Sequence, residues 1–306
     1  MNHYVIGIDL GGTKVEACLM DEARHVLSRV RTPAQAPLGL NTVIQNIHKV
    51  IADASAEKKY AAVGIGTPGT YVPEQDKLYG SPNSMIYETP GFIGRLKDEL
   101  GVPLVVENDA NCLALAEFFA NCEGKYRFVL AVILGTGFGT GLILDNKLYR
   151  GARGGAGEIG HTSIDLNGRL CGCGRKGCVE AYLSGPSLSR RFFERCGKIL
   201  DVPQIYHLYE TGNPEAVFLF KETFKIMGDV FANVVNTLDL EAIILGGGVS
   251  NLPIWYQKEN VAWEMQKSLF GVPRGEIPII KAKLGDSAGV IGAAYLALRE
   301  LGGISF

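Results

Sequence analysis

The sequence predicts an α/β protein made of two similarly built halves. The first observation is a run of three short β-type segments, separated by tight turns, at the start of the chain. The second is that the same device, a strand, a glycine turn and further strands, returns at Phe128. Beyond each run, helical periodicity alternates with short apolar stretches, which is typical of a sheet covered by helices. A repeat at a separation of roughly 125 residues indicates a duplicated domain.

The elements of the first half follow from its hydrophobic pattern. Its opening strand, Tyr4–Leu10, ends at two glycines, and the helix Leu40–Ala54 carries apolar residues at helical spacing. The helix Ala110–Ala120 follows two residues that can cap it, Asn108 and Asp109. The other predicted elements of this half are the strands Val15–Met20, His25–Arg31, Ala61–Gly66 and Val102–Val106 and the helix Phe92–Leu100.

The second half repeats this order. A strand, Phe128–Leu134, precedes a glycine turn at 135–141, and short strands follow at Leu142–Asp145 and Lys147–Tyr149. The later predicted elements are the helix Phe218–Leu238, the strand Ala242–Leu245, the turn Gly246–Gly248 and the helix Ala288–Leu301. We therefore expect one domain made of 1–120 plus 289–306 and a second made of 121–288, with a hinge at 121–126.

The composition excludes several classes of protein. Thirty lysines and arginines against 32 aspartates and glutamates give a net charge of −2, so no basic surplus is present to bind a nucleic acid. The longest apolar run, 128–144, is broken by glycines and threonines and does not predict a membrane helix. We expect no signal peptide, and the odd number of seven cysteines favours a reducing cytoplasm over a disulfide framework. The 39 glycines are expected in tight turns and ligand loops.

The segment Asp9–Lys14 is a candidate phosphate-binding turn. It reads Asp-Leu-Gly-Gly-Thr-Lys, so a carboxylate at a strand end is followed by two residues without a Cβ. Glycines let backbone N–H groups approach an anion, Thr13 and Lys14 can donate to phosphate, and Asp9 can hold a hydrated Mg²⁺. A plain hairpin turn is the alternative, but the second glycine turn at 135–141 favours phosphate binding. Neither turn has the spacing of a dinucleotide fingerprint or a P-loop.

Two further motifs carry candidate chemistry in their glycines and polar residues. Gly246–Gly248 follows a β-type run, and it either approaches a nucleotide or makes an ordinary strand-to-helix turn. Glu107-Asn108-Asp109 ends a buried strand, where α/β folds bind ligands. There Asp109 can accept a proton from a hydroxyl group that Asn108 holds in place. Helix capping is the alternative for this second motif, but it explains one such residue rather than three in succession.

One histidine and three cysteines predict a metal centre. His161, Cys171, Cys173 and Cys178 fall in the loop 161–178, with glycines at its turns. This is a Cys₃His set suited to a tetrahedral, structural Zn²⁺, and three buried free cysteines are the alternative. We expect the ion to brace two carboxylates that flank the loop, Glu158 and Glu180. The remaining cysteines are expected in the core, namely Cys18, Cys112, Cys122 and Cys196.

In this order, the motifs resemble the ROK family of sugar kinases, open reading frames and repressors. That family lies within the actin-like, hexokinase-type ATPase superfamily, and the resemblance extends from Gly7 to about Leu298. It rests on Asp-Leu-Gly-Gly-Thr-Lys, Gly66-Thr67-Pro68-Gly69, Glu107-Asn108-Asp109-Ala110, Gly135-Thr136-Gly137, Gly157-Glu158-Ile159-Gly160-His161 and Cys171–Glu180. The resemblance implies an α/β fold of two duplicated actin-like (ribonuclease H-like) domains around a central cleft.

The resemblance also implies an activity, which is transfer of the ATP γ-phosphoryl group to the 6-hydroxyl of a hexose or N-acetylhexosamine. By position in the motifs, Asp109 would be the general base. The sugar would be bound by Asn83, Asn108, Asp109, Glu158, His161 and Glu180. ATP and Mg²⁺ would be bound by Gly7, Asp9, Gly11, Gly12, Thr13, Lys14, Gly135, Thr136, Gly137, Gly246 and Gly247. His161 would double as a ligand of the structural Zn²⁺, and a homodimer is implied.

Three classes of protein stay open: a cytoplasmic hexose kinase, a sugar-sensing regulator and a non-catalytic scaffold of the actin type. Repressors of this family carry an N-terminal DNA-binding segment, for which a phosphate turn at Gly7 leaves no room, and a sensor would not need Asp109. The zinc cluster and the paired carboxylates argue against a scaffold. Glucose or N-acetylglucosamine is favoured over fructose and N-acetylmannosamine, without a deciding residue. The residues that could serve a dimer interface, or equally the core, are Trp255, Tyr256 and Trp263.

Overall fold

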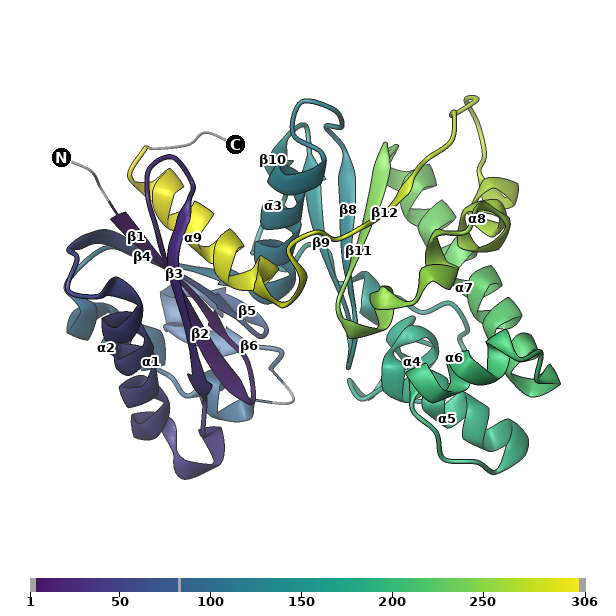
Figure 1. Cartoon of the computed structure of the whole chain (residues 1–306), viewed down its shortest axis with the longest axis horizontal. Helices are drawn as coiled ribbons and strands as arrows, with labels where there is room; N and C mark the ends of the chain where they lie inside the picture. The colour runs from purple at the N-terminus through teal and green to yellow at the C-terminus, as the bar shows by residue number, and fades with distance from the viewer. Residues whose placement is uncertain (1–3, 82–83, 303–306) are drawn as a thin grey trace. The chain divides into compact units, whose positions relative to one another are not determined.

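The structure, a computed structural model, describes residues 4–81 and 84–302. Asn83, a predicted sugar-binding residue, therefore lies outside the described residues. The chain forms two compact units (Figure 1). The first comprises the described residues up to Ala120, Lys147–Ala156 and those from Asp286 onward, and the second comprises Asn121–Asn146 and Gly157–Gly285. The expected division had assigned Lys147–Ala156 to the second domain, whereas the structure groups this segment with the first.

The first unit contains a five-stranded sheet in the order β3-β2-β1-β4-β7. The first three strands form an antiparallel meander, and β4 and β7 run parallel to β1. The strands are β1 (Tyr4–Leu10), β2 (Lys14–Met20), β3 (Val26–Pro33), β4 (Tyr60–Thr67) and β7 (Leu104–Asn108). A separate antiparallel pair follows β4, formed by β5 (Thr70–Val72) and β6 (Lys77–Tyr79).

A second five-stranded sheet has the order β10-β9-β8-β11-β12, which repeats the topology of the first. Here β8 and β9 are antiparallel, and β11 and β12 run parallel to β8. The strands are β8 (Val129–Leu134), β9 (Phe138–Leu144), β10 (Lys147–Leu148), β11 (Ala242–Gly246) and β12 (Ile279–Lys281). The predicted duplicated α/β fold is confirmed. The expected glycine turn at 135–141 is wrong in extent, because Gly139 and Gly141 pair within β9 and only 135–137 form the turn.

Helices cover both faces of the first sheet. The core on one face joins alternate residues of β1 (Ile6, Ile8 and Leu10) to α1 (Leu40–Ser55) and α2 (Phe92–Leu100). On the opposite face, α9 (Ala288–Glu300) packs across β1 and β4 and beside α3 (Asp109–Asn121), as Figure 1 shows for the yellow helix over the purple strands. This arrangement follows from strand alternation, since successive side chains point to opposite faces.

Two strand glycines allow the close approach of α9. A Cβ at Gly7 would lie 2.2 Å from Val290 O, and a Cβ at Gly64 would lie 1.9 Å from Ala293 O. Gly7 thus has a packing role in the middle of β1, and it does not lie in the turn where the nucleotide was expected. Glycine at position 7 is explained by helix packing alone.

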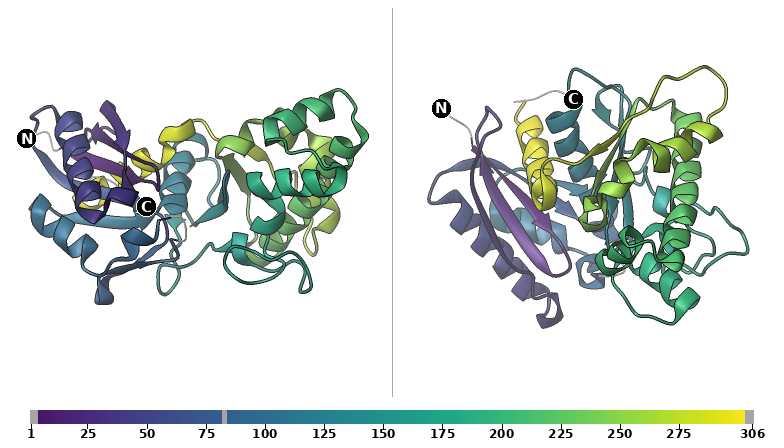
Figure 2. Two further views of the ribbon diagram at one scale, coloured as in Figure 1. Left: turned by 90° about the horizontal axis from the view of Figure 1, so that it is seen from below. Right: turned by 45° about the vertical axis from the view of Figure 1, so that its right-hand side comes forward.

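The second unit is built around the long helix α7 (Pro214–Leu238), drawn in green in Figure 2. Asn213 caps this helix with its side-chain oxygen, so α7 begins at Pro214 rather than at Phe218 as predicted. The shorter helices of this unit are α4 (Glu180–Leu183), α5 (Gly185–Cys196), α6 (Val202–Glu210) and α8 (Trp263–Ser268). Their apolar faces and the strands of the second sheet share one hydrophobic core with α7.

The three candidate interface aromatics divide between core and surface. Trp255 is fully buried against Phe220 and Phe224, and its indole N–H donates to Val249 O at 2.7 Å. Tyr256 is partly buried, and Trp263 is 56% exposed. Trp255 therefore belongs to the core.

Four cysteines were expected in the core. Three of them, Cys18, Cys112 and Cys122, are fully buried, and Cys196 is half-buried. In the part of the chain that the structure describes, no helix is both long and apolar enough to span a membrane.

Candidate active site

The parallel strands of the first sheet end along one edge, where polar residues gather. Asp9 of β1 lies opposite Gly66 of β4, and Gly66 lies opposite Glu107 of β7. Because neighbouring strands are about 4.8 Å apart, this row places the backbones of Asp9 and Glu107 roughly 10 Å apart. Asn108 ends β7 and Asp109 opens α3 directly after it. One edge of one sheet thus carries both the predicted magnesium ligand and the predicted general base.

Two hydrogen bonds within the first unit fix the turn between β1 and β2. Gly11 N–H donates to Lys14 O at 2.9 Å, and the Tyr87 hydroxyl donates to Gly11 O at 2.9 Å. Gly11 has no positive φ, and a Cβ there would meet only Lys14, at 3.4 Å from its carbonyl oxygen. Thr13 is exposed at the tip. The fold itself does not require glycine at position 11, so its missing side chain fits the approach of a ligand.

Asp9 is an acidic group whose charge the protein stabilises poorly. Burial raises the pKa of its carboxyl from 3.8 to about 6, and the Lys14 ammonium opposes this shift. The start of α9 lies against it, since a Cβ at Gly289 would come within 3.1 Å of Asp9 Cγ. The charge of Glu16, which lies opposite Asp9 in β2, is compensated by a guanidinium group. Arg31 Nε and Nη2 lie 2.8 and 2.5 Å from Glu16 Oε2. A cation bound at Asp9 would supply the charge compensation that Glu16 already has.

Asn108 is the cap of α3. Its Oδ1 accepts from the N–H groups of Ala110 (2.9 Å) and Asn111 (3.3 Å), and its Nδ2 donates to Gly69 O at 3.2 Å. The capping alternative therefore describes Asn108 correctly, and within 4–81 and 84–302 its Nδ2 has one hydrogen-bond acceptor, Gly69 O. Asp109 occupies the first position of the helix, and its Oδ1 accepts from Ala110 N–H at 2.8 Å.

The carboxylate of Glu107 forms hydrogen bonds that stabilise the start of α3. Its Oε1 accepts from Asn108 N–H and from Asn111 Nδ2, both at 2.9 Å, and its Oε2 pairs with Arg150 Nε. Two neutral donors and one guanidinium thus satisfy a carboxylate that is only 7% exposed. This ion pair also explains why Lys147–Ala156 joins the first unit. No sequence pattern pointed to Arg150, because its partner lies 43 residues away.

A cavity of about 680 Å³ lies beside the ion pair of Glu107 and Arg150. Its walls are residues 70–75, the end of β7 and the segment 150–154. Asn108 lines it, so a molecule placed there would meet the amide group next to Asp109. This cavity is the candidate place for a substrate within the first unit.

In the second unit, the turn 135–137 between β8 and β9 is also held from inside. Gly185 N–H, at the start of α5, donates to Gly135 O at 2.8 Å, and Phe138 N–H donates to Glu180 Oε2 at 3.0 Å. A Cβ at Gly137 would lie 2.8 Å from Glu180 Oε2, so glycine makes room for that carboxylate. Thr136 is exposed at the tip, as Thr13 is in the first unit.

The glycines of the turn Gly246–Gly248 differ in their surroundings. Gly247 has a φ of 88°, and a Cβ there would lie 2.6 Å from Leu134 O, so the fold requires glycine at this position. Gly248 has open space where a Cβ would be. For Gly135, the nearest atom to a Cβ would be Gly248 N at 4.0 Å. Two backbone turns of the second unit therefore face each other with no side chain between them.

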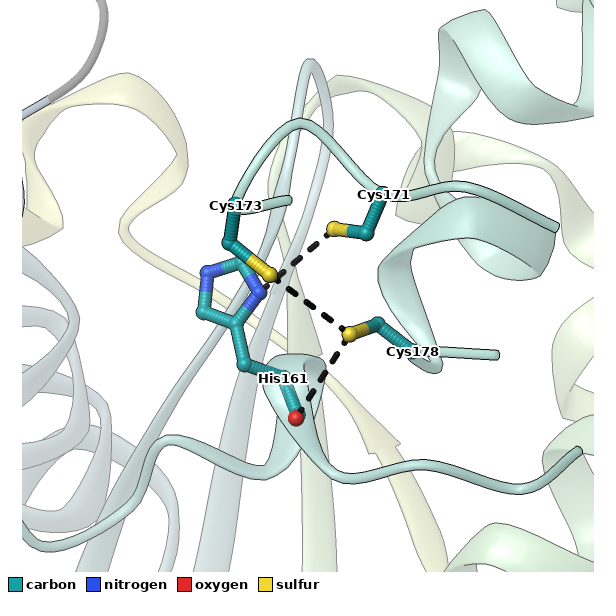
Figure 3. Close-up of side chains that lie close together, drawn as sticks. All are labelled: His161, Cys171, Cys173 and Cys178. Carbon is teal, nitrogen blue, oxygen red and sulfur yellow. Dashed lines mark hydrogen bonds between the residues drawn. The ribbon is translucent and has the colours of Figure 1, made fainter. Parts of the chain in front are cut away.

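The structure brings the four predicted metal ligands together. One ligand atom from each of His161, Cys171, Cys173 and Cys178 lies within 4.8 Å of the others. Figure 3 shows the sulfur atoms and the imidazole gathered around one point, with 3.6 Å between the Cys173 and Cys178 sulfurs and 3.7 Å from Cys171 Sγ to His161 Nδ1. Two Zn–S bonds of about 2.3 Å at a tetrahedral angle separate the sulfurs by about 3.8 Å. The donor set and its spacing fit a tetrahedral zinc ion.

The two carboxylates that flank the cluster are placed differently. Glu180 opens α4, and its Oε1 lies 3.8 Å from Cys171 Sγ while its Oε2 accepts from Phe138 N–H. It therefore links the cluster to the glycine turn of its unit. Glu158 precedes a short helical turn, Ile159–His161, and its carbonyl accepts from His161 N–H at 3.1 Å. The carboxylate of Glu180 thus contacts the cysteine–histidine cluster, whereas Glu158 is linked to His161 through its backbone.

A duplicated sheet with a phosphate-type turn in each copy, and an aspartate at the edge of the first, defines an actin-like, hexokinase-type ATPase. The chain belongs to the ROK family, whose model, described as "ROK family", matches residues 5–300. The prediction of this family from the motifs is confirmed.

The similar proteins span almost the full chain. The N-acetyl-D-glucosamine kinase of Pasteurella multocida is 34% identical over 309 residues, which cover 96% of this chain and 99% of that protein. The crystal structure of the ROK hexokinase from Thermus thermophilus has a TM-score of 0.88 at 32% identity, covering 98% and 99% of the two chains. The ROK family glucokinase from Streptomyces griseus, in complex with glucose and AMPPNP, has a TM-score of 0.78 at 32% identity, covering 97% and 99%.

Proposed function

We propose that this protein transfers the γ-phosphoryl group of ATP to the 6-hydroxyl of glucose or N-acetylglucosamine. As a ROK family member with N-acetylglucosamine kinase and glucokinase relatives, it is an ATP-dependent sugar kinase. The observation that carries the site assignment is the row Asp9–Gly66–Glu107. Asp9, just before the first glycine turn, and Glu107, just before Asn108 and Asp109, lie in this row with their backbones roughly 10 Å apart, which supports the assignment. A sugar hydroxyl and a terminal phosphate can meet across that distance.

Asp109 is the proposed general base. Its carboxylate would take the proton of the 6-hydroxyl as the sugar oxygen bonds to the γ-phosphorus, while the bond from that phosphorus to the β–γ bridging oxygen breaks and ADP leaves. Asn108 would orient the hydroxyl through the remaining hydrogen of Nδ2. Mg²⁺ held at Asp9 would neutralise charge on the phosphates. Positioning, more than covalent chemistry, supplies the rate in such a reaction.

The proposed phosphate contacts come from backbone turns in both units. In the first unit these are Gly11, Gly12, Thr13 and Lys14, and in the second they are Gly135, Thr136, Gly137, Gly246 and Gly247. The open space at Gly11 and between Gly135 and Gly248 supports this assignment. Gly7 is omitted from the proposal because its place under α9 accounts for it.

We further propose a structural Zn²⁺ on His161, Cys171, Cys173 and Cys178. All four ligands are protein atoms, so such an ion keeps no open position for substrate. The same histidine has its Nδ1 toward Cys171, which leaves Nε2 for a sugar hydroxyl. Glu158 and Glu180 would bind further hydroxyls, held in place by the cluster. The homodimer implied by the resemblance stays a prediction, which light scattering on the purified protein tests.

A coupled ADP-release assay tests the proposed function. The purified protein is supplied with ATP, Mg²⁺ and, in turn, glucose, N-acetylglucosamine, fructose and N-acetylmannosamine. We expect the highest kcat/KM for one of the first two sugars, with the product phosphorylated at position 6 by NMR. A higher kcat/KM for fructose or N-acetylmannosamine would overturn the choice of sugar. Absence of sugar-dependent ADP release with every hexose would overturn the kinase assignment itself.

A further inference from the structure

Tyr87 is a buried hydroxyl group that the proposed mechanism does not use. It lies in a short helical turn, Met85–Glu88, and its side chain is fully buried within the core under α1 and α2. Its ring stacks on Phe92 with centroids 6.0 Å apart at an angle of 23°. The hydroxyl donates to Gly11 O at 2.9 Å, across 76 residues of sequence. A rigid aromatic side chain therefore reaches from the core to the phosphate-binding turn.

This hydrogen bond sets the direction of one peptide group. The peptide between Gly11 and Gly12 is trans, so its C=O and N–H point in opposite directions. Since the carbonyl is held toward Tyr87 in the core, the Gly12 N–H faces away from the core. Among the described residues, that N–H donates to no partner, whereas Gly11 N–H is occupied by Lys14 O. The Gly12 N–H is thus an outward-facing hydrogen-bond donor at the tip of the turn.

The position of Tyr87 is itself fixed by backbone contacts. Tyr87 N–H donates to Ser84 O at 2.9 Å, and Ser84 N–H donates to Ser81 O at 2.8 Å. Ser81 Oγ in turn donates to Pro68 O at 2.7 Å, in the turn that follows β4. Burial also raises the pKa of the Tyr87 hydroxyl to about 12, so it stays protonated and remains a donor at every pH at which the protein is used.

We infer that Tyr87 is a positioning residue of the nucleotide site, which fixes the Gly11–Gly12 peptide so that the Gly12 N–H binds a phosphate oxygen of ATP. This inference rests on the proposed function, because it takes the turn to be the phosphate site. Without the hydroxyl, the Gly11 carbonyl loses its partner and the peptide is free to rotate. Glycines at both positions offer little resistance to that rotation. The ligand must then order the turn when it binds, which lowers affinity.

The test uses Tyr87→Phe, which removes one oxygen and keeps the ring. Calorimetry on the full chain, with Mg·ATP and separately with adenosine, separates phosphate binding from base binding. We expect the Kd for Mg·ATP to rise about five- to twentyfold, the size of effect expected for loss of about one hydrogen bond, while the Kd for adenosine stays within twofold. In kinetics, the KM for ATP should rise by a similar factor while the KM for the sugar is unchanged.

Two control variants separate this role from general destabilisation. Tyr79→Phe removes a hydroxyl that donates to the exposed Gln75 side chain. Ile47→Val removes one methylene group from the core that contains Tyr87, at a residue outside the turn. Both should bind Mg·ATP as the wild type does. An unchanged Kd for Mg·ATP in Tyr87→Phe overturns the inference, and so does an equal loss for adenosine, which would mark a structural role only.

The outcome is independent of the sugar assignment. Wild-type protein that binds Mg·ATP but phosphorylates no sugar would refute the proposed function, and the binding comparison would still decide the role of Tyr87.

Discussion

The two copies of the repeated strand–turn–strand device differ at corresponding positions. In the first unit Asp9 lies two residues before Gly11 and Lys14 three residues after it, whereas the second unit has Ile133 and Phe138 at the same distances from Gly135. The first turn spans four residues between the last paired residues Leu10 and Val15, and the second spans three between Leu134 and Phe138. The duplicated fold thus carries one charged turn and one neutral turn.

The two turns are also fastened differently. A side chain from the core, Tyr87, holds the carbonyl of Gly11, while a backbone N–H at the start of α5, that of Gly185, holds the carbonyl of Gly135. Charge and a side-chain clamp occur in the copy that also contains Asn108 and Asp109. The comparison teaches that two sheets of the same topology can carry turns that differ in charge and in the contacts that hold them.

If the first unit carries the reaction, the largest loss should follow Asp109→Asn. An amide cannot accept the hydroxyl proton, so kcat should fall by about 10²–10⁴, while binding of sugar and Mg·ATP is retained. The matched control is Asp145→Asn, the same exchange in the second unit at an exposed residue with a φ of 54°, which asparagine tolerates. Steady-state kinetics within threefold of the wild type for Asp109→Asn would show that this carboxylate is not the base.

The second unit should be most sensitive at its metal centre. Cys173→Ser replaces a thiolate by a poor zinc ligand, so Glu180 loses its brace through Cys171. We expect lost zinc, a lower Tm and a kcat/KM for sugar reduced by about 10²-fold, with Mg·ATP affinity changed far less. Cys196→Ser, outside the cluster, is the control. Elemental analysis should give about one zinc per wild-type chain, and fully active metal-free protein would contradict the zinc assignment.

The charge difference between the turns predicts a pH-dependent stability. The pKa of Asp9 is raised from 3.8 to about 6 in the folded protein, so the native state loses stability as the pH rises between these two values and stays at the lower level above them. Without Mg²⁺, Asp9→Asn should therefore raise the free energy of unfolding by about 1–3 kcal/mol at pH 8, and this gain should vanish at about pH 3, below the pKa of the unfolded carboxyl. Urea unfolding at both pH values measures it. A gain of equal size at both pH values would show that ionisation of Asp9 is not its cause.

The smallest expected effects, on stability and on Mg·ATP binding, distinguish a glycine that makes room for a ligand from a glycine that the fold requires. Gly11→Ala should leave stability within about 0.5 kcal/mol, since its Cβ has room, but it should weaken Mg·ATP binding. Gly247→Ala, with a φ of 88° and Leu134 O at 2.6 Å, should lower the free energy of unfolding by about 1–3 kcal/mol. Thermal unfolding and calorimetry on both variants measure this contrast. A large loss of stability in Gly11→Ala, together with weaker Mg·ATP binding and unchanged stability in Gly247→Ala, would contradict both assignments.

Local patterns were sufficient to predict most of the fold from the sequence. The strand–glycine–strand repeat predicted both sheets, and helical spacing predicted α1, α2, α3, α7 and α9 to within a few residues. Short elements such as α4 and β12 were missed because three or four residues show no clear period. The predicted turn, 135–141, was longer than the observed turn, 135–137, because glycines in a paired strand cannot be distinguished by sequence from glycines in a turn.

The candidate site was predictable where its residues are neighbours in sequence. The spacing of the histidine and cysteines indicated the cluster that these four side chains form, and Asn108 and Asp109 are adjacent in sequence. Arg150 and Tyr87 were not predictable, because each acts on a residue that lies 43 or 76 positions away. Gly7 was assigned to the nucleotide by its place in a motif, yet its neighbour is a helix near the far end of the chain. Only the folded structure reveals such partners.

The packing of α9 over Gly7 and Gly64 has a consequence for the order of assembly during synthesis. The second unit can close its core from residues 121–146 and 157–285, all of which leave the ribosome before α9. The face of β1 and β4 against which α9 packs, although translated earlier, lacks that helix until residues 288–300 emerge. Domains in most chains fold in the order in which they are made. We therefore expect the later unit of this protein to complete its core first, and α9, which is translated after that unit, to close the earlier one.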